Sequence, residues 1–391
     1  MLETDIHNIK RRYERVLERI KNSKQISERN KEIILNFKDY LVSESIGLSK
    51  LERYFFDLIK FDSMLKKPFE NATEADIRRV VSEINQTSLS EHTKRGFKLI
   101  VRRLYRFIRN CDKDDPHPPE VKWMSMKLSV KHSKLPEELL TEKEFLAIIR
   151  KCENIRDKAL ISTIAESGAR IGEIATMKLK HVSFEEYGAR LTINGKTGMR
   201  KILVVSSSPF LQRWINEHPK NDDPNNPLWH SQLGGFLHYK RIVAILKKAA
   251  RKAGIKKRVH LHLLRHSRAT QLASIMSEAS MKQYFGWVQG SKMAAIYVHM
   301  SGKDTDEAVL RANGIQIQKQ EKEITFQPIN CRRCNTNNPP TNKVCQMCGF
   351  VLDKKLQNKI IQEDEIRNER MDKIFKDQEI LELIRRKLAA Q

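Results

Sequence analysis

Apolar residues recur three or four positions apart through most of the first 110 residues, which is the period of one buried helix face. In one such segment these positions are Ile33, Ile34, Phe37 and Leu41. Two further segments, NATEADIRRVVSEIN and SLSEHTKRGFKLIVRRLYRFIRN, begin with residues that cap helix starts. The pattern predicts a helical domain over residues 26–112, preceded by a helix or arm over residues 1–25.

A proline-rich break follows this domain. Pro116, Pro118 and Pro119 stand within four residues, and a polar tract continues to Pro136. Because such a composition interrupts helices, we expect an extended linker over residues 113–138.

A second domain is expected over residues 139–315, where the helical pattern resumes near Thr141. One segment of this domain, ARLTINGKTGMRKILVV, differs, because Asn194 and Gly195 lie between two β-rich runs. An Asn-Gly pair in this setting predicts a β-hairpin. The expected fold class is therefore mainly α with a small β-hairpin or sheet: a helical N-terminal domain followed by an α+β domain.

Four cysteines near the C-terminus form two Cys-x2-Cys pairs that are ten residues apart. They are Cys331, Cys334, Cys345 and Cys348. Four thiolates arranged on two tight turns can surround one tetrahedral Zn²⁺ ion, so we expect a structural zinc ribbon over residues 328–352. The isolated Cys111 and Cys152 are interpreted as small buried apolar residues.

A charged helix is expected over residues 353–391, after the cysteines. Its apolar residues Ile374, Leu381 and Leu388 lie seven apart and would form a narrow seam. Such a seam suits packing against a partner helix or against the body of the protein.

The charge balance indicates a polyanionic partner. The chain has 73 Lys and Arg against 48 Asp and Glu, a net charge of +25, and basic side chains gain affinity by releasing counterions from phosphates. No apolar run approaches the roughly 20 residues of a membrane span, and the N-terminus does not resemble a signal peptide. We therefore expect a cytoplasmic, nucleoid-associated protein that binds double-stranded DNA and no membrane.

Two stretches concentrate the positive charge. Between Asp223 and Glu278 there is no acidic residue, but many Lys and Arg, which is typical of a nucleic-acid face. The second stretch, 94–109, is equally basic and interleaves Tyr105 and Phe107. It suits either a solvated helix face or a helix lying on phosphates.

Candidate chemistry lies in the second domain. It contains GARIGEI at 168–174, NGKTG at 194–198, HLLRHSRAT at 262–270, and FGWVQGSKMAAIYVH from Phe285 onward. Taken singly, each has an ordinary explanation as surface charge or core. Together and in this order they resemble the tyrosine site-specific recombinases, a family of phage-type integrases and Xer-like enzymes. The similarity is greatest to archaeal members with a C-terminal zinc ribbon, and it spans about Ile26 to Gly302.

The resemblance implies a site-specific DNA recombinase or integrase that cleaves and rejoins DNA through a 3′-phosphotyrosine, in integration, excision or dimer resolution. Tyr297 would be the nucleophile, and Arg170 and Arg265 would clamp the phosphate. Lys196 would protonate the leaving 5′-oxygen, with His262 assisting the proton transfer. Glu173 would support the site, and Trp287 would take the position that His or Trp has in relatives.

The same resemblance implies chemistry without metal or ATP, and four protomers assembled on two DNA sites. Two guanidiniums suit the charge of a pentacoordinate phosphorane. A tyrosine with a reference pKa of about 10 needs a base or a strongly positive site before it attacks.

Several alternatives stay open. Tyr284 is a second candidate nucleophile, Arg200 and Lys201 compete with Lys196, and Trp287 precedes Tyr297 by ten residues where many relatives have nine. Three histidines flank the motifs, and packing or helix capping explains each of them, namely His260, His266 and His299. At the level of function, a type IB topoisomerase or a catalytically silent DNA-binding regulator are the alternatives.

Overall fold

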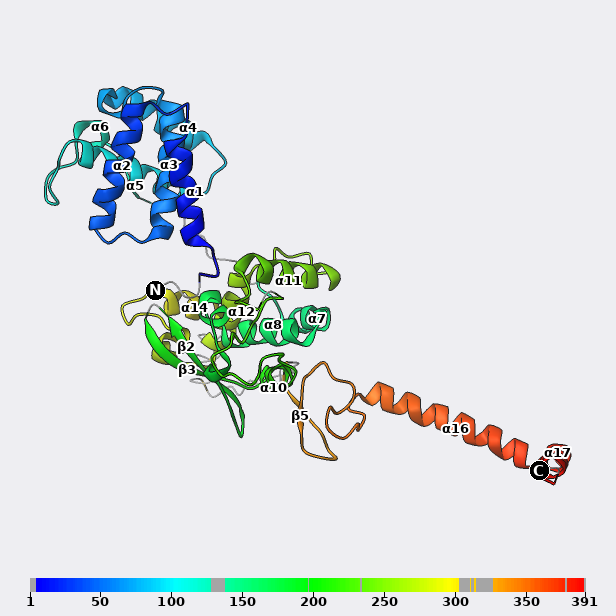
Figure 1. Cartoon of the computed structure of the whole chain (residues 1–391). Coiled ribbons are helices and arrows are strands. Elements are labelled where there is room, and N and C mark those ends of the chain that lie inside the picture. The colour runs from blue at the N-terminus through cyan, green and yellow to red at the C-terminus, as the bar shows by residue number, and fades with distance from the viewer. Residues whose placement is uncertain are drawn as a thin grey trace. The chain divides into compact units, whose positions relative to one another are not determined.

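The computed structural model describes residues 5–127, 138–195, 197–232, 234–301, 310, 313, 326–376 and 378–389. The chain divides into two compact units, Met1–Ser133 and Lys134–Gln391. Both are built mainly of helices, and the second contains a small antiparallel sheet, so the expected fold class is confirmed (Figure 1). In the parts of the chain that are described, no helix combines the length and apolarity of a membrane span.

Unit 1 is a helical bundle around an aromatic core. Its elements are α1 (Ile9–Lys21), α2 (Glu28–Ser43), α3 (Leu48–Leu65), the 3-10 turn η1 (Phe69–Asn71), α4 (Glu74–Gln86), α5 (Glu91–Ile108) and α6 (Pro119–Lys122). The side chains of Ser27, Thr73 and Ser90 cap α2, α4 and α5, as the sequence predicts. Helix α1 packs against α3 and contributes Val16 and Ile20 to the same core.

The aromatic residues of α5 belong to this core. Tyr105 is fully buried and donates its hydroxyl hydrogen to the carbonyl oxygen of Phe69 at 3.0 Å, and the Phe107 ring lies 5.2 Å from that of Phe37. Tyr105 and Phe107 are therefore core residues, and their presence among the basic side chains is no argument for a helix lying on phosphates. Part of the basic face is also neutralised, because Arg109 pairs with Glu120 at 2.6 Å.

The first part of the expected linker packs onto unit 1. Helix α6 contacts α4 and α5, and Val121 and Met124 are buried in the bundle core. The remainder, 128–137, lies outside the described residues.

Unit 2 is organised around the buried helix α8, which packs against α7, α10 and α12. Its helices are α7 (Glu142–Arg150), α8 (Ile155–Ser167), α9 (Ile171–Ala175), η3 (Leu179–His181), α10 (Ser208–Asn216), α11 (Tyr239–Lys252), α12 (Leu261–Ala273), α13 (Glu278–Phe285) and α14 (Met293–Ser301).

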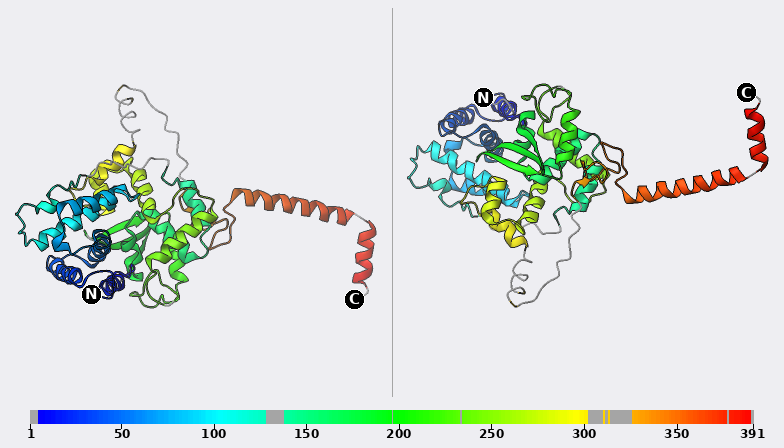
Figure 2. Two further views of the ribbon diagram at one scale, coloured as in Figure 1. Left: turned by 90° about the horizontal axis from the view of Figure 1, so that it is seen from above. Right: turned by 90° about the horizontal axis from the view of Figure 1, so that it is seen from below.

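The larger sheet of unit 2, drawn as green arrows in Figure 2, has the order β1-β2-β3. Its strands are β1 (Val182–Glu185), β2 (Gly188–Gly195) and β3 (Gly198–Val204). Strand β1 was not predicted. The predicted hairpin is confirmed, but its turn lies two residues further on, because Gly195 pairs with Gly198. Packing explains the shift: a Cβ atom on Gly195 would lie 2.2 Å from Glu173 Oε1, so strand β2 runs past the Asn-Gly pair against Glu173.

The C-terminal region contains β4 (Ile329–Asn330), β5 (Asn337–Asn338), α16 (Lys354–Lys376) and α17 (Gln378–Leu388). Its start is attached to the α-helical body of unit 2. The Phe326 ring lies 5.0 Å from the Phe145 ring of α7, and the Phe326 carbonyl accepts a 2.6 Å hydrogen bond from Ser206. Within α16, no described side chain is buried, and Ile374 of the predicted seam is exposed.

Candidate active site

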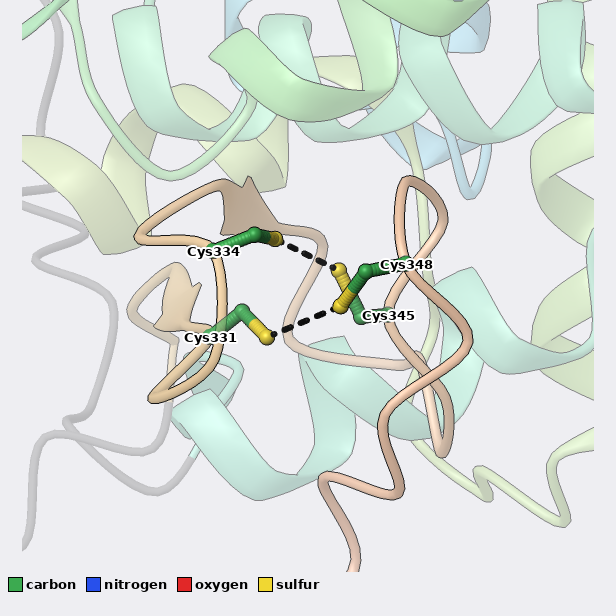
Figure 3. Close-up of side chains that lie close together, drawn as sticks. All are labelled: Cys331, Cys334, Cys345 and Cys348. Atoms are coloured by element: carbon green, nitrogen blue, oxygen red, sulfur yellow. Dashed lines mark hydrogen bonds between the residues drawn. The ribbon is translucent and has the colours of Figure 1, made fainter.

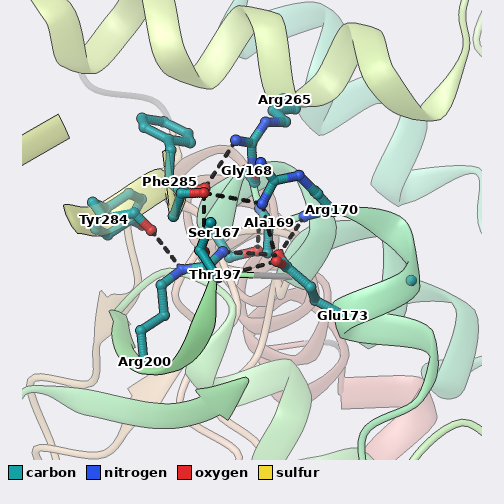
Figure 4. A network of polar contacts seen from close by, with 12 residues as sticks. Ser167, Gly168, Ala169, Arg170, Glu173, Thr197, Arg200, Arg265, Tyr284 and Phe285 are labelled. Carbon is teal, nitrogen blue, oxygen red and sulfur yellow. Dashed lines mark hydrogen bonds and ion pairs between the residues drawn. The ribbon is translucent and has the colours of Figure 1, made fainter. Parts of the chain in front are cut away.

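Three arginines from different segments bind three consecutive main-chain carbonyls at the end of α13 (Figure 4). Arg200 Nε donates to the Tyr284 oxygen at 3.0 Å and Arg265 Nη2 to the Phe285 oxygen at 2.9 Å. Arg170 Nη1 donates to the Gly286 oxygen at 3.1 Å. The last carbonyls of a helix have no partner within the helix and carry partial negative charge, which favours cations at this end. The segments around 170, 200 and 265 therefore converge on one point.

Arg265 is the most buried of the three, with 4% of its surface exposed. A second hydrogen bond, from Nη1 to the Gly168 oxygen at 2.7 Å, fixes its orientation on α12. Burial and the neighbouring charge of Arg170 lower the pKa of Arg265 to about 10, so it stays protonated at neutral pH. A guanidinium has five N–H donors, and these two bonds leave others for an anion.

Glu173 links the first arginine segment to the hairpin. Its carboxylate receives two hydrogen bonds from Arg200, at 3.0 and 2.8 Å, and one from Arg170 Nη1 at 3.2 Å. Burial raises the pKa of Glu173, but the hydrogen bonds and charge of Arg200 outweigh it, so the net shift is downward and the group is a carboxylate. Glu173 thus neutralises Arg200 and holds β3, the strand that follows Lys196.

Tyr297, on α14, is 2% exposed and belongs to a buried cluster with Phe285 and Trp287, the rings nearest to Arg265. Its ring is parallel to that of Trp287, with 5.6 Å between centroids, and its hydroxyl lies 2.5 Å from His266 Nδ1. Burial raises the pKa of the Tyr297 phenol, and the positive charge of Arg265 lowers it in part. Trp287 also stacks on Phe285 and lies under the Arg265 guanidinium, so these rings form one wall of the site.

The other predicted residues are placed as follows. His262 is exposed on α12, and its ring centroid lies 4.5 Å from that of His266. Lys196 lies outside the described residues, as does the side chain of His299. Of the alternatives to Lys196, Arg200 is held by Glu173, and Lys201 is exposed on β3.

Two alternatives have structural explanations. Tyr284 donates its hydroxyl hydrogen to the Glu166 carbonyl oxygen at 3.2 Å, and burial raises the pKa of this phenol. His260 caps α12, because its Nδ1 accepts from the Leu263 N–H at 3.0 Å. Sequence reasoning missed the three carbonyl acceptors, the Arg200–Glu173 pair and the contact of His266 with Tyr297. The one sequence signal for the carbonyl acceptors was Gly286, because glycine commonly ends a helix and so marks its last carbonyls.

The four C-terminal cysteines come together in one cluster that could hold a metal ion (Figure 3). The sulfur atoms of Cys331 and Cys348 are 3.5 Å apart, those of Cys334 and Cys345 are 3.6 Å apart, and all four lie within 4.8 Å of one another. A tetrahedral ion with Zn–S bonds of about 2.3 Å requires sulfurs roughly 3.8 Å apart. The donor set therefore fits a zinc-sized ion.

Comparison with known proteins finds a matching family and similar relatives. Residues 138–303 match the model of the phage integrase family. The tyrosine recombinase XerA of Pyrococcus horikoshii is 24% identical over 294 residues, which cover 73% of this chain and 95% of that protein.

Two solved structures share the fold. The XerH site-specific recombinase bound to palindromic difH substrate, in a post-cleavage complex, is 21% identical with a TM-score of 0.55, covering 80% of this chain and 98% of its own. A lambda integrase tetramer bound to a Holliday junction is 16% identical with a TM-score of 0.54, covering 68% and 76%.

Proposed function

We propose that this chain, whose residues 138–303 match the phage integrase family, is a tyrosine recombinase that cuts and rejoins double-stranded DNA at specific sites through a covalent 3′-phosphotyrosine. One observation supports this above all others. Arg170 and Arg265, which are 95 residues apart in the sequence, are anchored to adjacent carbonyls at the end of α13, and Tyr297 stacks on Trp287, over which the Arg265 guanidinium lies.

The arrangement suits attack on a phosphodiester. In the proposed reaction Arg170 and Arg265 bind the non-bridging oxygens, and Tyr297 Oη forms a bond to phosphorus as the bond from phosphorus to the 5′-oxygen breaks. The leaving oxygen takes a proton from Lys196, assisted by His262. Because a phosphodiester replaces a phosphodiester, the reverse attack by the 5′-hydroxyl reseals the strand without an external energy source.

The remaining parts of the proposal concern DNA and metal binding. Helix α11 and the loop after it present exposed cations suited to phosphates, among them Lys240, Arg241, Lys247, Arg251, Lys256 and Arg258. We propose that the cysteine cluster holds a structural Zn²⁺ ion and takes no part in strand transfer. By analogy with the lambda integrase tetramer, four protomers would assemble on the DNA.

The test captures the covalent intermediate. The full-length protein is incubated with a library of nicked duplexes of randomised sequence, so that cleavage releases a short 3′ fragment and traps the adduct. We expect an adduct that survives denaturation, that maps to the peptide carrying Tyr297, and that a Tyr297→Phe variant with unchanged duplex binding does not form. A shared sequence in the captured DNA indicates site-specific recombination, whereas capture without preference indicates relaxation of any DNA. No adduct, or an adduct on another residue, would contradict the proposal.

A further inference from the structure

We propose that His266 is the base that takes the proton of Tyr297 when the tyrosine attacks DNA. The inference rests on the proposed function and assigns a catalytic role to a histidine that the sequence left between a packing role and a part in the site. It starts from the short contact between the Tyr297 hydroxyl and Nδ1 of His266, 2.5 Å.

The position of His266 on α12 supports the assignment. Consecutive residues of a helix point about 100° apart, and here Arg265 is directed to the carbonyls of α13 while His266 is directed to Tyr297 of α14. One helix therefore supplies a phosphate ligand and a proton acceptor side by side. Hydrogen bonds to α13 and α14 hold these two neighbouring side chains in their different directions.

The surroundings of Tyr297 make a base necessary. The phenol is 2% exposed and stacked on Trp287, so bulk water has little access to its proton. Burial also raises its pKa, which disfavours spontaneous ionisation. A buried hydroxyl needs a hydrogen-bond partner, and in the tautomer with the proton on Nε2 the Nδ1 atom of His266 accepts that bond.

His262 is placed for a different task. Its ring is nearly perpendicular to that of His266, at 86°, and its side chain is exposed on the surface of α12, whereas His266 is half-buried. The proposed function gives His262, with Lys196, a role on the leaving-group side of the reaction. The two histidines would then serve opposite ends of the same displacement.

The proton balance is complete. As Tyr297 Oη bonds to phosphorus, its proton moves to His266 Nδ1 and produces an imidazolium with both nitrogens protonated. The 5′-oxygen leaves with a proton from the acid on the other side. During religation the imidazolium returns its proton to the departing phenolate, so the base is regenerated without a co-reactant.

The experiment distinguishes deprotonation of the tyrosine from protonation of the leaving 5′-oxygen. The duplex captured by the wild-type protein is resynthesised with sulfur in place of the bridging 5′-oxygen, because a thiolate leaves without protonation. The test variant is His266→Asn, whose amide oxygen can accept the tyrosine hydrogen bond but is not a base. The matched control is Lys196→Ala, on the leaving-group side.

General-base catalysis contributes about 10²–10⁴-fold, so we expect His266→Asn to slow cleavage by a factor in that range on both the oxygen and the sulfur duplex. Lys196→Ala should be slow on oxygen and recover on sulfur. A difluorotyrosine at position 297 tests whether His266 only positions the tyrosine. Its phenol is more acidic and needs a base less, so it should restore cleavage by the His266→Asn variant if His266 is the base.

Three results would overturn the inference. His266→Asn could cleave as fast as wild type, could recover on the sulfur duplex as Lys196→Ala does, or could gain nothing from the fluorinated tyrosine. Each leaves the proposed function intact as long as the wild-type protein forms its adduct on Tyr297. If the wild-type protein forms none, the proposed function fails and this inference with it. Duplex binding and circular dichroism of the variant, unchanged from wild type, exclude misfolding.

Discussion

Replacing Arg200 with methionine removes the main partner of a carboxylate that has almost no access to water. The Glu173 side chain is 4% exposed and the Arg200 side chain 10%, and two hydrogen bonds join them. Removing one partner of such a buried pair typically costs about 3–5 kcal/mol, because the other charge stays buried without compensation. Since Arg170 still donates two hydrogen bonds to Glu173, from its main-chain N–H and from Nη1, we expect a loss near the lower end, about 3 kcal/mol.

The assay is urea unfolding followed by tryptophan fluorescence at neutral pH. Of the four tryptophans only Trp123 lies in unit 1, so a Trp123→Phe background makes the signal report on unit 2. Arg213→Met is the matched control, because Arg213 pairs with Glu217 on the surface of the same unit, with side chains 49% and 48% exposed. Such exposed pairs contribute at most about 1 kcal/mol. Equal losses for the two variants would refute the reasoning.

The pH dependence gives an independent check. In the wild-type protein the pKa of Glu173 is lowered, so its contribution to stability is present above its unfolded pKa and is lost as the pH falls through the folded pKa. Without Arg200, burial dominates and the pKa of Glu173 in the folded variant rises above its unfolded value. As the pH falls, protonation of Glu173 therefore removes the cost of the buried charge. The stability difference should therefore narrow between pH 7 and pH 4. A difference that stays constant would show that lost packing, not charge, destabilises the variant.

Three further outcomes follow from the structure. Gly286→Ala should destabilise unit 2 by about 1–3 kcal/mol in the same urea assay, because Gly286 has φ +62° and an added Cβ would lie 2.6 Å from Arg200 Nη1; Gly290→Ala, with open space around it, is the control and should be near neutral. The purified chain should release about one zinc ion per molecule on thiol modification, and Cys345→Ser should release almost none; equal release from both would exclude the cysteine cluster as the site. Cys152 should react with a disulfide reagent far more slowly than Cys111, because burial raises its pKa to about 12, and equal labelling of the two peptides would contradict its burial.

Sequence patterns predicted the features that depend on near neighbours. Helix caps such as Ser27 and Thr73 lie within three residues of the N–H groups that they accept from, and the cysteine pairs lie on single turns. The turn of the hairpin was misplaced because Gly195 is held in β2 by Glu173, a contact that local propensity does not contain. Tyr105 was misread for a similar reason, since its carbonyl partner on Phe69 lies 36 residues away.

In the candidate site, too, the sequence indicated local features and missed contacts between distant segments. Arg170, Arg265 and Tyr297 were named only through resemblance to a family, because nothing in their own segments indicates that they meet. The roles of Arg200 and His266 depend on the approach of β3 to α9 and of α12 to α14. Such approaches are decided by the packing of the whole unit.

The acceptors of the three arginines at the end of α13 are all peptide oxygens, and this affects how the site can change over time. The side chains of Tyr284 and Phe285 can be exchanged without removing a single acceptor from the guanidiniums, so drift at these positions would leave the charge arrangement unaltered. Selection would act instead on the point where the helix ends, through the backbone at Gly286. A one-residue insertion in α13 would displace all three carbonyl acceptors together, whereas a substitution at Tyr284 or Phe285 leaves each acceptor in the main chain.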